Sequence, residues 1–193
     1  MDEAELIAQL KRHHIEALEP LVREYQAQAM GAAYLITGSR DEAEDVVQTA
    51  FIRAYEHIGQ FDSARGFKPW FMRIVINTAI NQLPKQNNTS IDDISTELYL
   101  SAANTIWDSL TEIERQIEEN QLRETIISAL DKLPGEQRAV VVMRYYLDME
   151  DDEIAQILKR PSGTIKWRLH NARKYLRAIL RRKNSKEDLA LDI

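Results

Sequence analysis

The chain has 193 residues, of which 44% are hydrophobic and 29% charged, and its formal net charge is −6. A chain of this length and composition can bury the core of one domain or of two small ones. No apolar run approaches the roughly 18 residues of a membrane span, and the acidic start MDEAELIAQL does not fit a signal peptide. The absence of cysteine excludes disulfides and thiolate metal sites and suits a cytoplasmic protein.

Charge is distributed unevenly along the chain. Residues 1–90 hold 9 basic and 12 acidic side chains, a net charge of −3. Residues 91–118 hold 1 basic and 7 acidic side chains, net −6, and residues 119–193 hold 15 basic and 12 acidic ones, net +3. An acidic stretch therefore separates a mildly acidic half from a basic one.

Helical periodicity begins near the first residue and continues through the first half of the chain. It predicts helices over residues 3–12, 15–36, 39–58 and 69–83. Gly38 can end the second helix, and Ser39 followed by Glu42 is typical of a capping box that opens the third. Residues 59–68 are expected to form a structured loop, and Pro69 suits the first turn of the fourth helix.

Pro84 ends the fourth helix, and the segment 85–93, KQNNTSIDD, is typical of a linker. Helical spacing resumes from Trp107 to Leu133, where a Pro-Gly pair interrupts it. The pattern then predicts further helices, over residues 136–147, 151–158 and a long basic stretch after Ser162. These elements predict an all-α chain of two helical domains joined by an acidic linker.

The segment 159–186 is strongly basic, because it holds eleven Lys or Arg and no Asp or Glu. After a turn at 159–162, apolar residues recur at helical spacing and form one stripe, at Ile165, Leu169, Ala172, Leu176 and Ile179. The opposite face and its flanks carry polar and basic side chains, at Lys166, Trp167, Arg168, His170, Asn171, Arg173 and Lys174. Such a helix suits the major groove of DNA, although a solvated surface helix is the plainer alternative.

A short helix over 151–158, a turn and a second helix describe a helix-turn-helix. The apolar side of the first helix is expected to pack on the stripe of the second, through Ile154, Ala155, Ile157 and Leu158. Ser162 is predicted to cap the second helix, and the free amides there, with Lys159 and Arg160 nearby, suit a phosphate. Trp167 fits equally well against DNA or against a partner helix.

A second candidate for nucleic-acid binding lies on the predicted helix 69–83. Asn77 and Asn81 are four residues apart, so their amides project side by side, and an amide offers both donors and an acceptor to an unpaired base edge. Neighbouring aromatic and basic side chains can stack bases and hold a strand, namely Phe61, Arg65, Phe67, Lys68, Trp70 and Arg73. Paired asparagines on a helix are, however, more often ordinary surface residues.

Three stretches of the chain together resemble one protein family. They are DEAEDVVQTAFIRAY at 41–55, FKPWFMRIVINTAIN at 67–81, and the segment from Leu133 to Leu176 with its helix-turn-helix. In this order and separation they resemble the sigma factors of bacterial RNA polymerase, specifically the small extracytoplasmic-function (ECF) group. The resemblance implies four parts: a region 2 domain over 1–90, an acidic linker over 91–109, a region 4 domain over 110–183 and a tail over 184–193.

The resemblance also implies roles for particular residues. The helix at 41–55 would dock on the clamp helices of the largest polymerase subunit, through Asp45, Gln48 and Thr49. The loop and helix after it would melt and read the −10 promoter element, through Phe61, Asp62, Arg65, Lys68, Trp70, Arg73, Asn77 and Asn81. The helix-turn-helix would read the −35 element, through Lys159, Arg160, Ser162, Thr164, Lys166, Trp167, Arg168, His170, Asn171, Arg173 and Lys174.

By the same resemblance, the partners are promoter DNA and core RNA polymerase, which binds through its largest-subunit clamp helices and the flap of its second-largest subunit. An anti-sigma factor is expected to hold the chain inactive, in the cytoplasm or at the inner face of the membrane when that factor is anchored there. No catalytic residue, metal, cofactor or small-molecule substrate is expected.

Four features depart from the family pattern. Thr49 stands where the family often has Glu, which would weaken one polymerase contact. A single cation, Lys85, follows the −10 helix, where several are usual. Asn171 stands where Arg is common, which predicts an altered −35 preference. Glu150 replaces the usual Ser at the cap of the short helix, where its charge still favours the helix dipole.

Two other interpretations are open. One is a stand-alone regulator that binds duplex DNA without polymerase, and the other is a degenerate sigma-like protein that acts as a protein-binding module. An enzyme is not expected, because the sequence has no Gly-rich phosphate loop, no cysteine and no HExxH or nucleophile signature.

Overall fold

In the computed structural model, residues 2–63, 66–83 and 124–190 are described, with side chains described as far as residue 178. Within these ranges the chain is helical and contains no strand, which confirms the predicted all-α fold. None of the described helices is both long and apolar enough to cross a membrane. The predicted linker over 91–109 and the helical spacing that starts at Trp107 lie outside the described residues.

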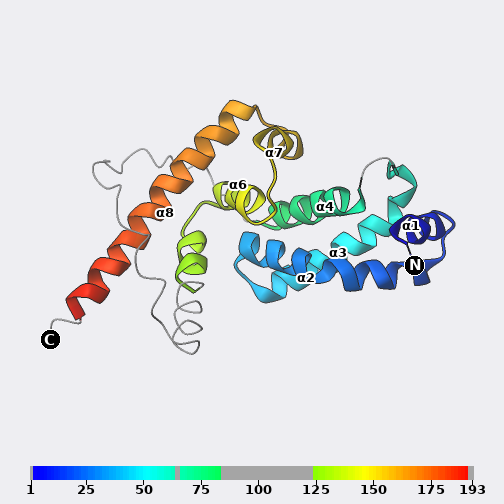
Figure 1. Ribbon diagram of the computed structural model, residues 1–193, viewed down its shortest axis with the longest axis horizontal. Helices are drawn as coiled ribbons and strands as arrows, with labels where there is room; N and C mark the ends of the chain where they lie inside the picture. The colour runs from blue at the N-terminus through cyan, green and yellow to red at the C-terminus, as the bar shows by residue number, and fades with distance from the viewer. Residues whose placement is uncertain (1, 64–65, 84–123, 191–193) are drawn as a thin grey trace.

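The N-terminal unit, residues 2–83, is a bundle in which α2, α3 and α4 pack on one another (Figure 1). Its elements in chain order are α1 (Glu3–Lys11), the 3₁₀ turn η1 (Ile15–Ala17), α2 (Leu18–Thr37), α3 (Arg40–Glu56), the 3₁₀ turn η2 (Ile58–Gln60) and α4 (Phe67–Gln82). Aromatic rings stack in the core between them, where the Phe71 ring lies 4.4 Å from that of Phe51 and 5.7 Å from that of Phe67. The predicted helices of this half are confirmed to within a few residues at their ends.

The turn between α2 and α3 largely follows the predicted signals. Gly38 ends α2 in the left-handed conformation, with a φ of 78°, and its amide donates to the Tyr34 carbonyl over 2.8 Å. The Ser39 hydroxyl accepts from the Glu42 amide over 3.4 Å, which is one half of the predicted capping box. The Ser39 amide donates to Thr37 Oγ1 over 3.3 Å, so a local turn takes the place of the reciprocal half.

A polar contact ties α1 to the bundle. The Tyr25 hydroxyl donates to the Glu3 carboxylate. Burial, together with this hydrogen bond, raises the pKa of Tyr25, so the phenol stays protonated and keeps its donor. The contact therefore helps to hold α1 beside α2 and places the end of α1 near the loop before α4.

The C-terminal unit, residues 124–190, begins with a helical segment at 124–131 and continues through α6 (Gly135–Tyr145), α7 (Asp151–Leu158) and α8 (Ser162–Ala190). α7 and α8 pack along the predicted apolar stripe, where Ile154 and Ile165 are fully buried. α8 extends away from the bundle, and the two chain ends lie at opposite sides of the molecule (Figure 1). The helix continues through the predicted tail as far as Ala190.

Capping of the two helices of the helix-turn-helix differs from the prediction in one respect. Glu150 is the N-cap of α7, and its amide donates to Glu153 Oε2 over 3.1 Å, so the acidic residue caps the helix as expected. The prediction that Ser162 caps α8 is wrong, because α8 already begins at Ser162, directly after Pro161. The Ser162 hydroxyl instead donates to Asp152 Oδ1 over 2.6 Å and ties α8 to α7.

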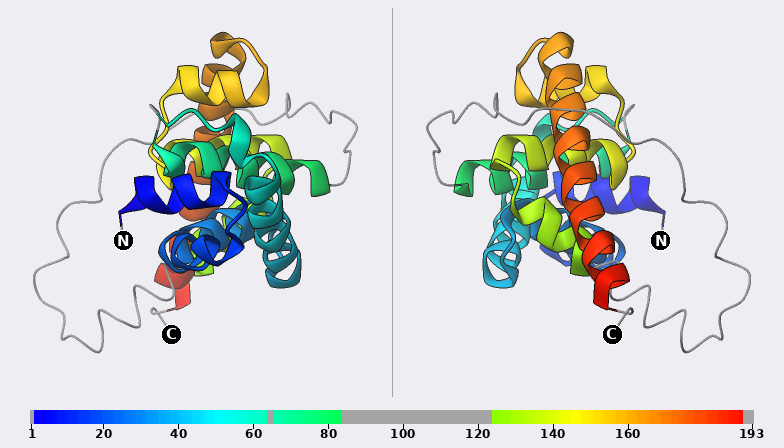
Figure 2. Two further views of the ribbon diagram at one scale, coloured as in Figure 1. Left: turned by 90° about the vertical axis from the view of Figure 1, so that its right-hand side faces the viewer. Right: turned by 90° about the vertical axis from the view of Figure 1, so that its left-hand side faces the viewer.

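The two units are in direct contact, because α6 packs against α2 and α4, and α7 also touches α4. One buried apolar cluster runs across both units and includes Val140, Val142 and Met143 of α6. The views in Figure 2 show α7 and the start of α8 together at one end of the molecule, above the N-terminal bundle. This contact is a finding of the structure, since the sequence predicts two domains but gives no sign of how they meet.

Candidate nucleic-acid interfaces

The polar face of α4 is built as predicted. Asn77 and Asn81 are exposed on one side of the helix, and Arg73 is half-buried one turn before them. Phe71 and Val75, which are fully buried, anchor the opposite side in the core. Two neighbouring amides are thereby presented to solvent on a helix that is fixed from behind, which suits the capture of a base edge.

Trp70 begins this face and belongs to an aromatic cluster at the start of α4. Its ring lies 5.1 Å from that of Phe61 and 5.6 Å from that of Phe67. Trp70 is half-buried, whereas Phe61 and Phe67 expose only 4% and 1% of their surfaces. In this form Trp70 is the one of the three that offers ring surface for stacking, and base contact by Phe61 stays a prediction. Asp62 and Lys68 are exposed.

Lys11, at the end of α1, holds the loop that leads to this cluster. Its ammonium donates to the Phe61 carbonyl over 2.8 Å and to Ser63 Oγ over 3.2 Å. It also lies 5.7 Å from the centre of the Phe61 ring. No local sequence pattern identifies Lys11, because its partner Phe61 is 50 positions away. Arg65 of the same loop lies outside the described residues.

The solvent face of α3 carries the residues that the family resemblance assigns to polymerase binding. Asp45 and Gln48 are exposed, and Thr49 is half-buried. Ile52 lies four residues after Gln48 on the same face and exposes 58% of its surface. It adds apolar contact area to a polar face, and its place outside the buried stripe of α3 is the sequence signal for it.

The basic face of α8 points away from its buried stripe, as predicted. Its exposed members are Lys166, Trp167, His170 and Arg173, while Thr164, Asn171 and Lys174 are half-buried at its edge. Trp167 exposes 54% of its surface, so its ring is not used for helix packing in this form. The face is thus open to a groove of duplex DNA along its length.

Two arginines of the predicted −35 set are engaged within the protein. Arg168 pairs with Glu136 of α6, and only 13% of its side chain is exposed. The same carboxylate lies 4.0 Å from Arg160. Arg168 therefore helps to fix α8 on α6, and its contact with DNA stays a prediction that requires this pair to open. Lys159, in the turn before α8, has a φ of 50°, a conformation that favours glycine or asparagine.

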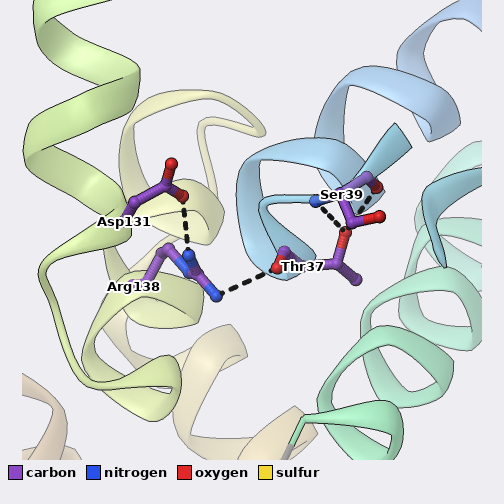
Figure 3. Close-up of polar contacts among 4 residues, drawn as sticks. All are labelled: Thr37, Ser39, Asp131 and Arg138. Atoms are coloured by element: carbon purple, nitrogen blue, oxygen red, sulfur yellow. Dashed lines mark hydrogen bonds and ion pairs between the residues drawn. The ribbon is translucent and has the colours of Figure 1, made fainter. Parts of the chain in front are cut away.

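Arg138 of α6 links the two units, and no local sequence pattern identifies it. Only 8% of its surface is exposed. Its guanidinium pairs with Asp131 over 2.8 Å and donates to the Thr37 carbonyl at the end of α2 over 3.4 Å (Figure 3). The residue is thus fixed by one partner from each unit.

Comparison with known families assigns both units. Residues 21–89 match the family model of Sigma-70 region 2, and residues 123–176 match that of Sigma-70, region 4. The chain is 32% identical to the ECF RNA polymerase sigma factor SigW of Bacillus subtilis, over 91% of this chain and 95% of that protein. It is 30% identical to the ECF RNA polymerase sigma-E factor of Escherichia coli, over 87% of this chain and 88% of that protein.

Two solved structures are similar in fold. The structure of CnrH in complex with the cytosolic domain of CnrY has a TM-score of 0.60 at 22% identity, covering 92% of this chain and 96% of that one. The sigma factor RpoE in complex with the anti-sigma factor NepR, from Bartonella quintana, has a TM-score of 0.57 at 20% identity, covering 84% and 98%.

Proposed function

Because the chain belongs to the ECF group of RNA polymerase sigma factors, we propose that it binds core RNA polymerase and directs initiation at promoters with particular −35 and −10 elements. One observation carries this proposal. The region 2 and region 4 matches fall on two units that each present an accessible face suited to nucleic acid, on α4 and on α8. The role requires no catalytic residue in this chain, because the polymerase performs the chemistry.

In this role α4 captures unpaired bases of the −10 element. The amides of Asn77 and Asn81 hydrogen-bond to base edges that strand separation exposes, and Trp70 stacks on a neighbouring base. The accessibility of the two amides, and the support of Trp70 by buried aromatic rings, favour this assignment. Arg73 and Lys68 flank the face and contact the strand's phosphates.

The second reading element is α8, which lies in the major groove of the −35 duplex. Lys166, His170 and Arg173 face the DNA from the exposed side of the helix. Lys159 and Arg160 in the preceding turn hold the phosphate backbone, which fixes the register of the helix. The absence of acidic residues across 159–186 favours approach to the DNA backbone.

Binding of polymerase falls to α3 in this proposal. Asp45, Gln48 and Thr49 contact the clamp helices of the largest subunit, and Ile52 extends the contact with an apolar side chain. The C-terminal unit contacts the flap of the second-largest subunit. The two contacts place the two reading units on one polymerase.

Regulation by an anti-sigma protein is part of the same proposal. The structurally similar CnrH and RpoE are each bound to another protein, the cytosolic domain of CnrY and the anti-sigma factor NepR. A protein of this class holds the present chain inactive in the cytoplasm, or at the membrane where it is anchored, by covering its polymerase-binding or DNA-reading faces. Pull-downs from the native host that recover polymerase but never an inhibitor would argue against it.

Sequencing of transcript 5′ ends after induced expression tests the proposed function. New start sites should share one upstream motif with two elements at constant spacing. A matched variant, Asn77→Ala with Asn81→Ala, should accumulate normally yet produce none of these starts. If transcripts change without any shared pair of elements, the chain is a stand-alone regulator and the proposal fails.

A further inference from the structure

The contact between the two units is made at the exposed end of a helix. Arg138 inserts its guanidinium at the C-terminus of α2, where it donates to the Thr37 carbonyl over 3.4 Å, and Asp131 pairs with it over 2.8 Å (Figure 3). The last carbonyls of a helix lack intrahelical partners and carry the negative end of its dipole. A cation from the other unit therefore fits this place by charge as well as by hydrogen bonding.

Gly38 leaves the space in which this contact forms. A Cβ at Gly38 would lie 2.8 Å from Asp131 Oδ1 and 3.2 Å from Arg138 Nη1, closer than side chains normally approach. The contact is also incompletely satisfied, because the buried Arg138 Nε has no hydrogen-bond partner and 45% of the Asp131 side chain is exposed. An interface with an unsatisfied donor and a half-solvated ion pair is suited to opening.

Two more close approaches complete the interface, and each uses a glycine. The Tyr146 hydroxyl lies against Gly31 of α2, so closely that a Cβ at Gly31 would collide with it. Leu83, just after α4, lies against Gly135 at the start of α6, where Leu83 Cδ1 is 2.6 Å from the position of a Cβ. The two units therefore meet at several separate points along α2 and α4.

This packing holds the two reading faces close together. α7 touches α4, and the 8 residues of α7 with the first 13 of α8 span only roughly 30 Å end to end at 1.5 Å per residue. By their names, the −10 and −35 elements lie about 25 base pairs apart, which is about 85 Å of duplex at 3.4 Å per base pair. The packed form cannot place both faces on one promoter.

We propose that this packed form is a resting state, closed by the Arg138 contact at the end of α2, and that core RNA polymerase opens it by holding the two units apart. The inference rests on the proposed function as a sigma factor. The chain has the reach to open, because the 40 residues 84–123 span up to about 130 Å when extended. The reading faces themselves stay accessible in the closed form, so closure prevents two-element binding without blocking either element alone.

A reversible covalent lock tests the proposal. The chain has no cysteine, so Leu83→Cys with Gly135→Cys introduces one defined pair of thiols. The Cβ position at Gly135 is 3.3 Å from Leu83 Cγ, and Leu83 Cβ is one bond further, within reach of the about 3.5–4.5 Å that a disulfide spans between Cβ atoms. Removing the Leu83 side chain also removes the group with which a side chain at 135 would collide.

With the disulfide formed, we expect promoter-dependent transcripts from added core polymerase to fall at least about ten-fold, as an equilibrium driven to one state requires. Affinity for an isolated −35 duplex should not change, and reductant should restore initiation. The single variant Leu83→Cys controls for the oxidant. Equal initiation by the fully oxidised and reduced forms would overturn the closed state while leaving the proposed function standing.

A second measurement does not depend on transcription. The rate at which the two thiols form a disulfide should be high in the free chain and at least about ten-fold lower in the chain bound to core polymerase, because the bound chain is open. A rate that is equal in the free and bound chains would contradict opening by polymerase, even if the locked variant were inactive for another reason.

Discussion

Single side chains outside the two reading faces hold those faces in place. Lys11 fixes the carbonyl of Phe61 and the hydroxyl of Ser63 in the loop before α4. Arg53 of α3 donates to Thr78 Oγ1 over 3.0 Å on the buried side of α4. Hydrogen bonds of this kind contribute about 0.5–1.5 kcal/mol each, so their loss should shift the position of the site more than it lowers the stability of the fold.

Lys11→Met, which removes the donors but keeps a long side chain, tests the first of these contacts. We expect promoter opening, measured by permanganate reactivity of −10 thymines, to fall about five-fold, because one such contact contributes about 1 kcal/mol. Core-polymerase affinity should not change. Lys11→Arg, which keeps charge and donors, is the matched control. Normal opening with Lys11→Met would show that Lys11 does not position the loop.

Asn77→Ala addresses the base contact itself. Loss of a well-formed hydrogen-bonded base contact is worth about 1–3 kcal/mol, so open-complex formation should weaken by ten-fold or more while binding to core polymerase is retained. Gln82→Ala, which removes an exposed amide from the end of the same helix, is the control and should be neutral. If polymerase binding falls in parallel with opening, a folding defect explains the result and the assigned role is lost.

Residue-scale assignments from the sequence succeed where a local pattern carries them. The exposure of Asn77 and Asn81 follows from the apolar stripe of their own helix, and the structure confirms it. Glu136 could not be recognised in this way, because its partner Arg168 is 32 positions away and is fixed only when α6 and α8 pack. Phe61 is similar, since its burial depends on rings that only the folded loop brings together.

At the scale of helices, the sequence predicts existence and type well, and helix ends less well. The apolar spacing of 3.6 residues and the left-handed Gly38 locate α2 and α3. The start of α8 was predicted one position late, because Ser162 is a good capping residue in isolation but is claimed by Asp152 of the neighbouring helix. A tertiary hydrogen bond thus overrides the local preference for a cap.

The turn between α7 and α8 gives a prediction in which stability and binding change in opposite directions. Lys159 adopts a φ of 50° there, a conformation that costs a side chain with a Cβ roughly 1 kcal/mol. Lys159→Gly should therefore raise the free energy of unfolding by about 1 kcal/mol while weakening binding to a −35 duplex, because one phosphate contact is lost.

Chemical denaturation and fluorescence anisotropy measure the two quantities separately. Lys159→Asn, which removes the charge and also tolerates the left-handed conformation, should match the glycine variant in binding. Unchanged affinity in both variants would remove Lys159 from the DNA-binding set, and a lower stability in the glycine variant would contradict the claim of strain.

At the scale of the whole molecule, the charge distribution sets how the chain approaches DNA. Residues 91–118 carry a net charge of −6, whereas residues 119–186 hold 15 basic and 9 acidic side chains, net +6. Replacing the seven acidic residues of 91–118 by their amides should raise affinity for a −35 duplex at low salt. The gain should shrink as salt screens the repulsion. Equal affinities of the two chains at low salt would show that the acidic segment does not restrain the reading helix.

The contact between the two units is the part of the architecture that the sequence could not supply. Helix periodicity reports which face of α6 is apolar, but Val140 and Met143 would satisfy that pattern against any apolar partner. The meeting of Arg138 with the end of α2 joins residues 101 positions apart and leaves no local trace. Closed and open forms differ in this contact, so only a structure can reveal it.

Initiation in a purified system tests the central claim most directly. Core RNA polymerase, this chain and a pool of genomic fragments should yield transcripts that start at defined positions, each preceded by the same pair of −35 and −10 sequences. Core polymerase alone, or with the Asn77→Ala and Asn81→Ala variant, should not produce them. Tight binding of the chain to duplex DNA without stimulation of any transcript would contradict the account, because it would make the protein a DNA-binding regulator and not an initiation factor.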